Sequence, residues 1–183
     1  MLPSSLTLPG AILASVLIAS PAIADMKLQL PGLQDGSFSA AQVLSGFGCD
    51  GQNRSPELVW SGAPIETKSF IVTAYDPDAP TGSGLWHWSA FNIPPSVVRL
   101  DEGAASAGGT MPTGALQARN DFSHNQYDGA CPPKGSSHHY VVTVFAMPMD
   151  SLPLDATASS AMVGFFANTG SLARASVVVT YGR

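Results

Sequence analysis

Histidine and aspartate side chains carry most of the chemistry that this sequence offers. Imidazole N–H groups donate hydrogen bonds to anions, and a nearby carboxylate can fix the tautomer of an imidazole or raise its pKa. Pro77 and Pro80 fix the backbone around two of the carboxylates, which are therefore held in place. An Asp-Pro-Asp turn can equally be a capped turn with no further role. The residues concerned are Asp76, Asp78, His87, His124, His138 and His139.

Alternation of side chains along a strand sorts three of these histidines. His138 and Tyr140 are two residues apart and share a face, so His139 points to the other side. The same rule groups His87 with Ser89, Phe91 and Ile93, and it places Trp86 and Trp88 on the opposite face. His124 lies in a loop with no visible partner.

Strands are the main elements expected to position these groups. Residues 69–75, 85–93, 139–147 and 175–181 are rich in β-branched and aromatic residues, whereas residues 101–137 are mostly loop. The one helix expected covers residues 156–168, with Asp155 or Thr157 as its N-cap and Gly170 at its end. Without a regular βαβ rhythm, antiparallel sheets packed together are the predicted architecture.

Composition indicates one domain and excludes a nucleic-acid surface. The 183 residues are 45% hydrophobic and 11% charged, and the formal net charge is −5 with 8 Lys plus Arg. No basic run occurs, so nucleic acid is not an expected partner. Beyond the first 24 residues no stretch is long and apolar enough to span a membrane.

The first 24 residues are expected to be a signal peptide. They contain no charged side chain, and the apolar stretch 11–19 is followed by Ala22-Ile23-Ala24, an A-x-A cleavage pattern. The n-region lacks Lys and Arg, and a mis-assigned start codon or a disordered tail is the alternative. Cleavage after Ala24 would leave residues 25–183 as the mature domain, in the periplasm or secreted.

The two cysteines, Cys49 and Cys131, are expected to form a disulfide, because an even count in an exported protein favours one. Two separate buried thiols are the alternative. A lone pair is too few for a zinc site made of cysteines.

Three ordered motifs resemble the phosphatidylethanolamine-binding (Raf kinase inhibitor-like) family. The first signature is similar to YDPDAPTGSG at residues 75–84, followed by Trp86-His87-Trp88 and Asn92-Ile93-Pro94. Residues 53–60 resemble the family segment that precedes the first signature. The sequence YDGACPPKG at residues 127–135, followed by His138-His139-Tyr140, resembles the second signature. The match runs from Phe47 to Tyr181, and the His-His-Tyr variant with the leader resembles the bacterial YbhB/YbcL branch.

The resemblance implies a mainly β fold, with a large antiparallel sheet packed on a smaller one and a C-terminal helix. It also implies a pocket for phosphate-like anions at one end of the sheet. The ligand-binding residues carried over are Asp76, Asp78, His87, Cys131, Pro132, His138 and Tyr140, with Asp78 in a supporting role and the Cys131-Pro132 backbone as a wall. Many members have Arg where His139 stands, and residues 166–170 do not match the C-terminal site residues of eukaryotic members, so ligand selectivity does not transfer.

The expected function is therefore an exported binding protein for a small anion or a phospholipid head group, without a cofactor or a metal and without catalytic turnover. One rival is an interaction protein of the kinase- or protease-inhibitor type. The other is an enzyme, since a carboxylate and two imidazoles can bind a metal or activate a nucleophile. No G-x-S-x-G or H-E-x-x-H motif occurs, which disfavours the enzyme.

Overall fold

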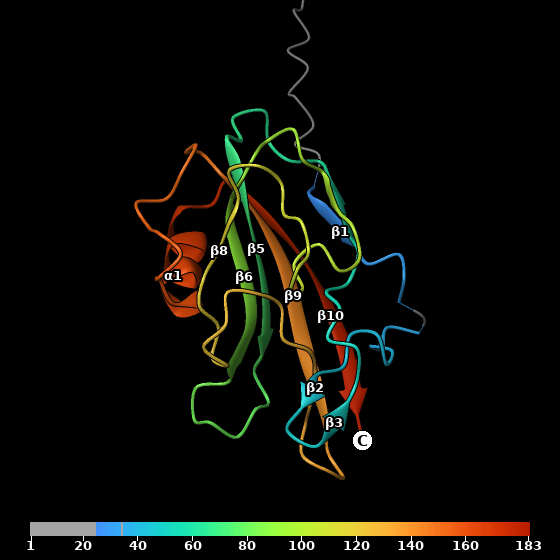
Figure 1. Cartoon of the computed structure of the whole chain (residues 1–183). Helices are drawn as coiled ribbons and strands as arrows, with labels where there is room; N and C mark the ends of the chain where they lie inside the picture. The colour runs from blue at the N-terminus through green and yellow to red at the C-terminus, as the bar shows by residue number, and fades with distance from the viewer. Residues whose placement is uncertain (1–24, 34) are drawn as a thin grey trace, which may run out of the picture.

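The computed structural model describes residues 25–33 and 35–183. Its centre is a five-stranded sheet in the order β10-β9-β5-β6-β8, in which all neighbours are antiparallel. A three-stranded antiparallel sheet, β1-β4-β7, packs on one face, and α1 lies against the other (Figure 1). The expected fold class, mainly β with two packed sheets and one helix, is confirmed. The proposed signal peptide lies outside the described residues.

The long strands are those predicted from composition. The large sheet contains β5 (Ser69–Asp76), β6 (Leu85–Ile93), β8 (Leu116–Gln117), β9 (Ser137–Met147) and β10 (Ala173–Gly182). The small sheet contains β1 (Lys27–Gln29), β4 (Leu58–Ser61) and β7 (Arg99–Leu100), and β2 (Ser45–Gly46) pairs with β3 (Cys49–Asp50) in a separate hairpin. Among the described residues α1 (Ser160–Gly170) is the one α-helix, and it is not long and apolar enough to cross a membrane.

Two hydrophobic cores lie on the two faces of the large sheet. The larger core fills the space between the sheets and contains Trp60, Phe70, Trp88 and Val142. The smaller core lies under α1. Burial of apolar area on both faces stabilises the sheet and makes it a rigid frame for its ends. At the lower end in Figure 1, the end of β5 and the start of β9 lie near the β2–β3 hairpin.

The helix begins four residues later than predicted. Ser159 is the N-cap, and its hydroxyl accepts a hydrogen bond from the backbone N–H of Met162. Asp155, one of the two predicted caps, instead accepts hydrogen bonds at Oδ1 from the backbone N–H and the hydroxyl of Thr157. Asp and Ser both favour caps and turns, so sequence could not decide which one starts the helix.

The predicted faces of β6 are wrong because the strand contains two bulges. Ala74 pairs with Trp88 and Tyr75 with Trp86, which leaves His87 as an extra residue. The Trp86 ring therefore packs against Gly164 of α1, while Trp88 lies in the core between the sheets. A bulge places two residues opposite one and breaks the alternation of side chains.

The second bulge has the same effect at the other end of β6. Phe91 lies under α1, Ile93 lies between the sheets, and Asn92 adopts a positive φ of 58°. The predicted grouping of His87 with Ser89, Phe91 and Ile93 on one face therefore does not hold.

Candidate functional site: a pocket at the end of the large sheet

Asp76, the last residue of β5, lies at the centre of the site with 2% of its surface exposed. One carboxylate oxygen, Oδ1, accepts hydrogen bonds from the backbone N–H groups of Asp78 and Ala79, at 2.8 and 3.1 Å. The other, Oδ2, lies 2.7 Å from Nδ1 of His138. Because an ionised carboxylate can only accept, His138 donates here. These three bonds offset the cost of burying the negative charge.

The predicted faces of β9 are correct. His138 and Tyr140 are buried and point into the site, whereas His139 is exposed. His139 donates its backbone N–H to Asp78 Oδ2, and its Nδ1 lies 2.7 Å from the same oxygen. These bonds lower the pKa of Asp78, the backbone bond contributing most. Asp78 therefore fastens the turn after β5 to β9 and does not line the pocket.

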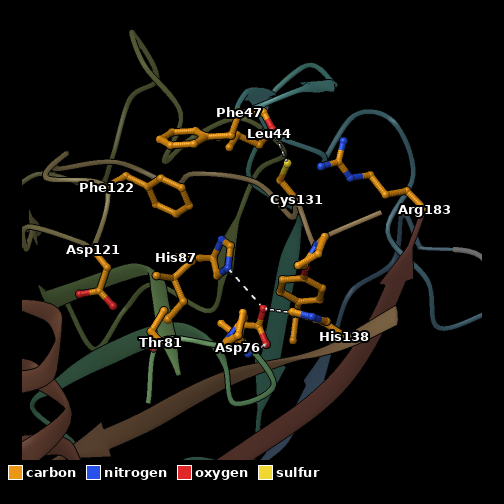
Figure 2. Close-up of a pocket in the computed structure, with 15 residues that line it drawn as sticks. Leu44, Phe47, Asp76, Thr81, His87, Asp121, Phe122, Cys131, His138 and Arg183 are labelled. Carbon is orange, nitrogen blue, oxygen red and sulfur yellow. Dashed lines mark hydrogen bonds and ion pairs between the residues drawn. The ribbon is translucent and has the colours of Figure 1, made fainter. Parts of the chain in front are cut away.

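His87 points into the site because of the bulge in β6. Its ring packs edge-on against Tyr140, with ring centroids 5.2 Å apart. Nδ1 lies 2.8 Å from the backbone carbonyl of Asp128, and since a carbonyl only accepts, Nδ1 carries the hydrogen. Nε2 has no hydrogen-bond partner among the described residues and lies 4.0 Å from Asp76 Oδ2 (Figure 2).

Burial sets the protonation of both rings. It lowers the pKa of His87, and this outweighs the Asp128 carbonyl and the Asp76 carboxylate, which raise it. The imidazole is therefore neutral near pH 7, with a lone pair on Nε2. Burial and the Asp76 carboxylate raise the pKa of Tyr140, so the phenol keeps its proton. The backbone amide of Cys131 lowers the pKa of Tyr140, but burial and Asp76 outweigh it. The amide is not in hydrogen-bonding geometry, so the Tyr140 hydroxyl has no partner in the described part of the chain.

A cavity of about 540 Å³ opens over these groups. Asp76, His87, His138 and Tyr140 form its polar floor, and the walls are mainly apolar. Figure 2 shows Phe47 and Phe122 above His87, with Arg183 on the opposite side beyond Cys131. The lining residues not predicted from sequence are Leu44, Phe47, Ala79, Pro80, Thr81, Leu85, Asp121, Phe122, Pro133 and Arg183.

Arg183 brings a positive charge to the rim of the pocket. Its Nε donates to the Pro132 carbonyl at 2.7 Å, and its Nη1 donates to the Gly48 carbonyl. Cys131 lines the cavity as predicted, whereas Pro132 contributes by holding Arg183 and the wall is completed by Pro133. The resemblance could not identify Arg183, because no motif reaches it.

The predicted disulfide is present between Cys49 and Cys131, with the Cα atoms 5.9 Å apart. It joins β3 to the wall of the pocket across 82 residues of sequence. Phe47, at the turn between β2 and β3, is 81% exposed and packs edge-on against Phe122. The bond therefore fixes the hairpin that forms the upper lip of the pocket.

A buried polar cluster behind His87 was missed from sequence. The Asp128 carboxylate is 2% exposed and accepts hydrogen bonds from the side-chain amides of Asn53 and Asn120, at 3.1 and 2.7 Å. His124, predicted to lack a partner, lies with Nδ1 2.9 Å from Asp128 Oδ2. This cluster holds the carbonyl to which His87 donates. Nothing in the spacing of these residues indicated their meeting.

Among residues 25–33 and 35–183, no group of three or more His, Cys, Asp or Glu side chains is arranged to hold a metal ion. Asp76 already uses three hydrogen bonds, one of them to His138. The arrangement is instead that of a small polar floor under an apolar mouth, with one cation at the rim.

Comparison with known proteins agrees with this architecture. The family model described as "Phosphatidylethanolamine-binding protein" matches residues 34–182. The chain belongs to the phosphatidylethanolamine-binding protein family. The expected similarity to YbcL and YbhB is also confirmed. The chain is 50% identical over 146 residues to UPF0098 protein YbcL of Escherichia coli, covering 79% of this chain and 80% of YbcL. It is 48% identical over 157 residues to UPF0098 protein YbhB of the same organism, covering 85% and 99%.

The crystal structure of Escherichia coli YbcL, described as a new member of the mammalian family, has the same fold. It superposes with a TM-score of 0.83 at 45% identity, covering 87% of this chain and 99% of YbcL. A more distant relative of Mycobacterium tuberculosis, named "Putative lipoprotein LppC", is 30% identical over 151 residues, covering 81% of this chain and 69% of LppC.

Proposed function

We propose that this member of the family is an exported binding protein whose pocket takes a small oxyanion, either free phosphate or the phosphate of a lipid head group, without catalytic turnover. The observation that carries the proposal is the floor of the cavity. There, His87 Nε2 and the Tyr140 hydroxyl are buried and without hydrogen-bond partners among residues 25–33 and 35–183. Buried polar atoms normally have partners, so two such atoms facing one cavity indicate a ligand.

The negative charge of Asp76 does not exclude an anion. Its two oxygens accept three hydrogen bonds from protein groups, and one of these holds His138 in place. Asp76 thus acts as the anchor of an imidazole, while Arg183 supplies positive charge at the rim. Three or four charge-assisted hydrogen bonds of about 1.5 to 3 kcal/mol each, less the costs of binding, correspond to micromolar to millimolar affinity.

The test is a titration of the ¹⁵N-labelled protein with phosphate, phosphoethanolamine and acetate, followed by NMR. We expect saturable shifts of residues around the pocket with the two phosphates. His138→Ala should abolish binding, because it removes the hydrogen-bond donor of Asp76 Oδ2 and leaves this carboxylate charge facing the anion. His139→Ala is the matched control and should bind normally, since that ring faces away. Equal losses in the two variants, or unchanged binding in His138→Ala, would contradict the proposed site.

The two phosphate probes distinguish the sources of the ligand. Tighter binding of phosphoethanolamine favours a lipid head group, and equal binding favours the phosphate alone. A panel of phosphate-ester and carboxylic-ester substrates incubated with the same protein tests turnover. Hydrolysis that depends on His138 or His87 would contradict the non-enzymatic part of the proposal.

Export is supported by the Cys49–Cys131 disulfide, since such bonds persist mainly in oxidising compartments, and by the relative LppC. Mass spectrometry of the protein isolated from the periplasm or the medium should give Asp25 as the first residue. Soluble cytoplasmic protein that retains Met1 would contradict cleavage after Ala24.

A further inference from the structure

The floor of the pocket presents acceptors where an anion needs donors. His87 Nδ1 gives its hydrogen to the Asp128 carbonyl, so the neutral ring turns a lone pair on Nε2 toward the cavity. Asp76 Oδ2, which is another acceptor, lies 4.0 Å from Nε2. Of the unpartnered atoms of the floor, only the Tyr140 hydroxyl can donate as it stands.

An oxyanion placed against this floor would meet the lone pair of Nε2 and the charge of Asp76. The contact becomes favourable once Nε2 carries a hydrogen, because the imidazolium then lies between two negative charges. We propose that the pocket binds its oxyanion together with one proton, which His87 takes up at Nε2. The inference rests on the anion binding proposed above and specifies how the same site achieves it.

Two carboxylates near the ring, those of Asp76 and Asp128, favour this proton uptake. The charged and titratable groups that face His87 or its direct partners come from β5, β9, the loop behind the ring and the rim of the pocket; they are Asp76, Asp121, His124, Asp128, His138, Tyr140 and Arg183. Asp76 and Asp128 already raise the pKa of His87, but burial outweighs them in the free protein. A bound anion adds a further negative charge beside Nε2 and tips the balance toward the imidazolium.

The positive charge of Arg183 does not take the place of a proton on His87. Its guanidinium is tied to the carbonyls of Pro132 and Gly48, and in Figure 2 it lies at the rim, on the far side of Cys131 from His87. His138 gives its Nδ1 hydrogen to Asp76, and its Nε2 is not one of the buried polar atoms that lack a partner among the described residues. His87 Nε2 is the buried atom of the floor that can change from acceptor to donor.

The probe is dimethyl phosphate, whose single negative charge does not titrate near neutral pH, so any proton taken up must reside on the protein. Calorimetric titrations at pH 7.5 in two buffers with different protonation enthalpies give the number of protons taken up per anion. We expect close to one. The dissociation constant should rise about tenfold per pH unit between pH 7 and 8.

Nitrogen NMR of the imidazoles identifies the acceptor of the proton. On saturation, the Nε2 resonance of His87 should move from the position of an unprotonated ring nitrogen to that of a protonated one. Binding with no proton uptake and an unprotonated Nε2 would overturn the inference while leaving the proposed function intact. Absence of binding by any probe would refute the proposed function itself.

Two glutamine variants complete the test. His87→Gln removes the titrating ring, and its binding should no longer take up a proton. His139→Gln, the matched exposed control, should bind with the same proton uptake as the wild type. Proton uptake that persists in His87→Gln would place the proton elsewhere and overturn the inference. If this variant binds too weakly to measure, the Nε2 resonance of the wild-type protein decides alone.

Discussion

At the scale of single residues, the site depends on which atoms of each side chain are already occupied. Asp76 accepts a hydrogen bond from His138, and Asp78 is paired with His139 on the outer surface. His87 and Tyr140 each have one polar atom with no hydrogen-bond partner in the described part of the chain. Three carboxylates, Asp76, Asp78 and Asp128, therefore hold the structure around the pocket together. The proposed binding groups are the His87 imidazole and the Tyr140 phenol, with the Arg183 guanidinium at the rim.

Loss of Asp128 should lower the stability of the fold. Its buried carboxylate accepts from Asn53, Asn120 and His124, and Asp128→Ala would leave these donors without their acceptor. We expect the free energy of unfolding to fall by about 2 to 4 kcal/mol, measured by urea denaturation. Asp150→Ala, at an exposed aspartate, is the control and should change it by less than about 0.5 kcal/mol. Similar losses in both variants would mean that the cluster contributes little.

The sequence predicted the sheet face of a side chain correctly where the alternation along a single strand decides it. Alternation correctly separated His139 from His138 and Tyr140, because β9 runs without a bulge between its paired positions at this end. The same rule failed on β6, where one extra residue at His87 reverses the face. A bulge depends on the register between two strands, and a single strand does not contain that information.

At the scale of elements, the ends of the strands build the pocket and the loops close it. The β2–β3 hairpin carries Phe47 over the cavity, and its attachment to Cys131 is covalent. The long strands were predictable from their composition. The hairpin was not, because its strands have two residues each and too few side chains for a pattern.

The disulfide gives a prediction at this scale. Thiol titration of the denatured, unreduced protein should detect no free cysteine. Reduction should lower the free energy of unfolding by about 4 to 5 kcal/mol in the chain-entropy account, because the bond closes a long loop. It should also weaken phosphate binding, since Phe47 and Cys131 line the pocket.

The control for this prediction is the double variant Cys49→Ser, Cys131→Ser, which should be as unstable as the reduced protein and insensitive to reductant. Two reactive thiols in the unreduced protein would show that the bond is absent. A reduced protein that binds phosphate as tightly as the oxidised one would show that the lip does not contribute.

At the scale of the whole molecule, the site is assembled from segments that are far apart in the sequence. Arg183 reaches the rim because β10 pairs with β9, which places Gly182 beside Ser137. Asn53 and Asp128 meet behind His87 through the packing of two loops. Sequence predicted the two-sheet fold through motifs carried by three segments. It could not place residues whose role depends on the packing of loops, since the same residues occur in many unrelated loops.

The burial of His87 also links the stability of the whole fold to pH. In the unfolded chain its imidazole titrates near the ordinary value of about 6.5, whereas burial lowers the pKa in the folded protein. Between the two pKa values the unfolded chain binds more protons than the folded one. The stabilisation is therefore complete above about pH 6.5 and is lost as the pH falls toward the lower, folded pKa.

We therefore expect the free energy of unfolding, without added anion, to decrease between pH 7.5 and pH 5.5, with a slope of at most about 1.4 kcal/mol per pH unit from this one group. Urea denaturation at several pH values measures it. His87→Gln should flatten the slope, because its side chain does not titrate, whereas His139→Gln should retain it. Saturating dimethyl phosphate should oppose the loss, since the bound anion favours the imidazolium in the folded state. A slope that is the same in wild type and His87→Gln would mean that His87 is not the group buried in its neutral form.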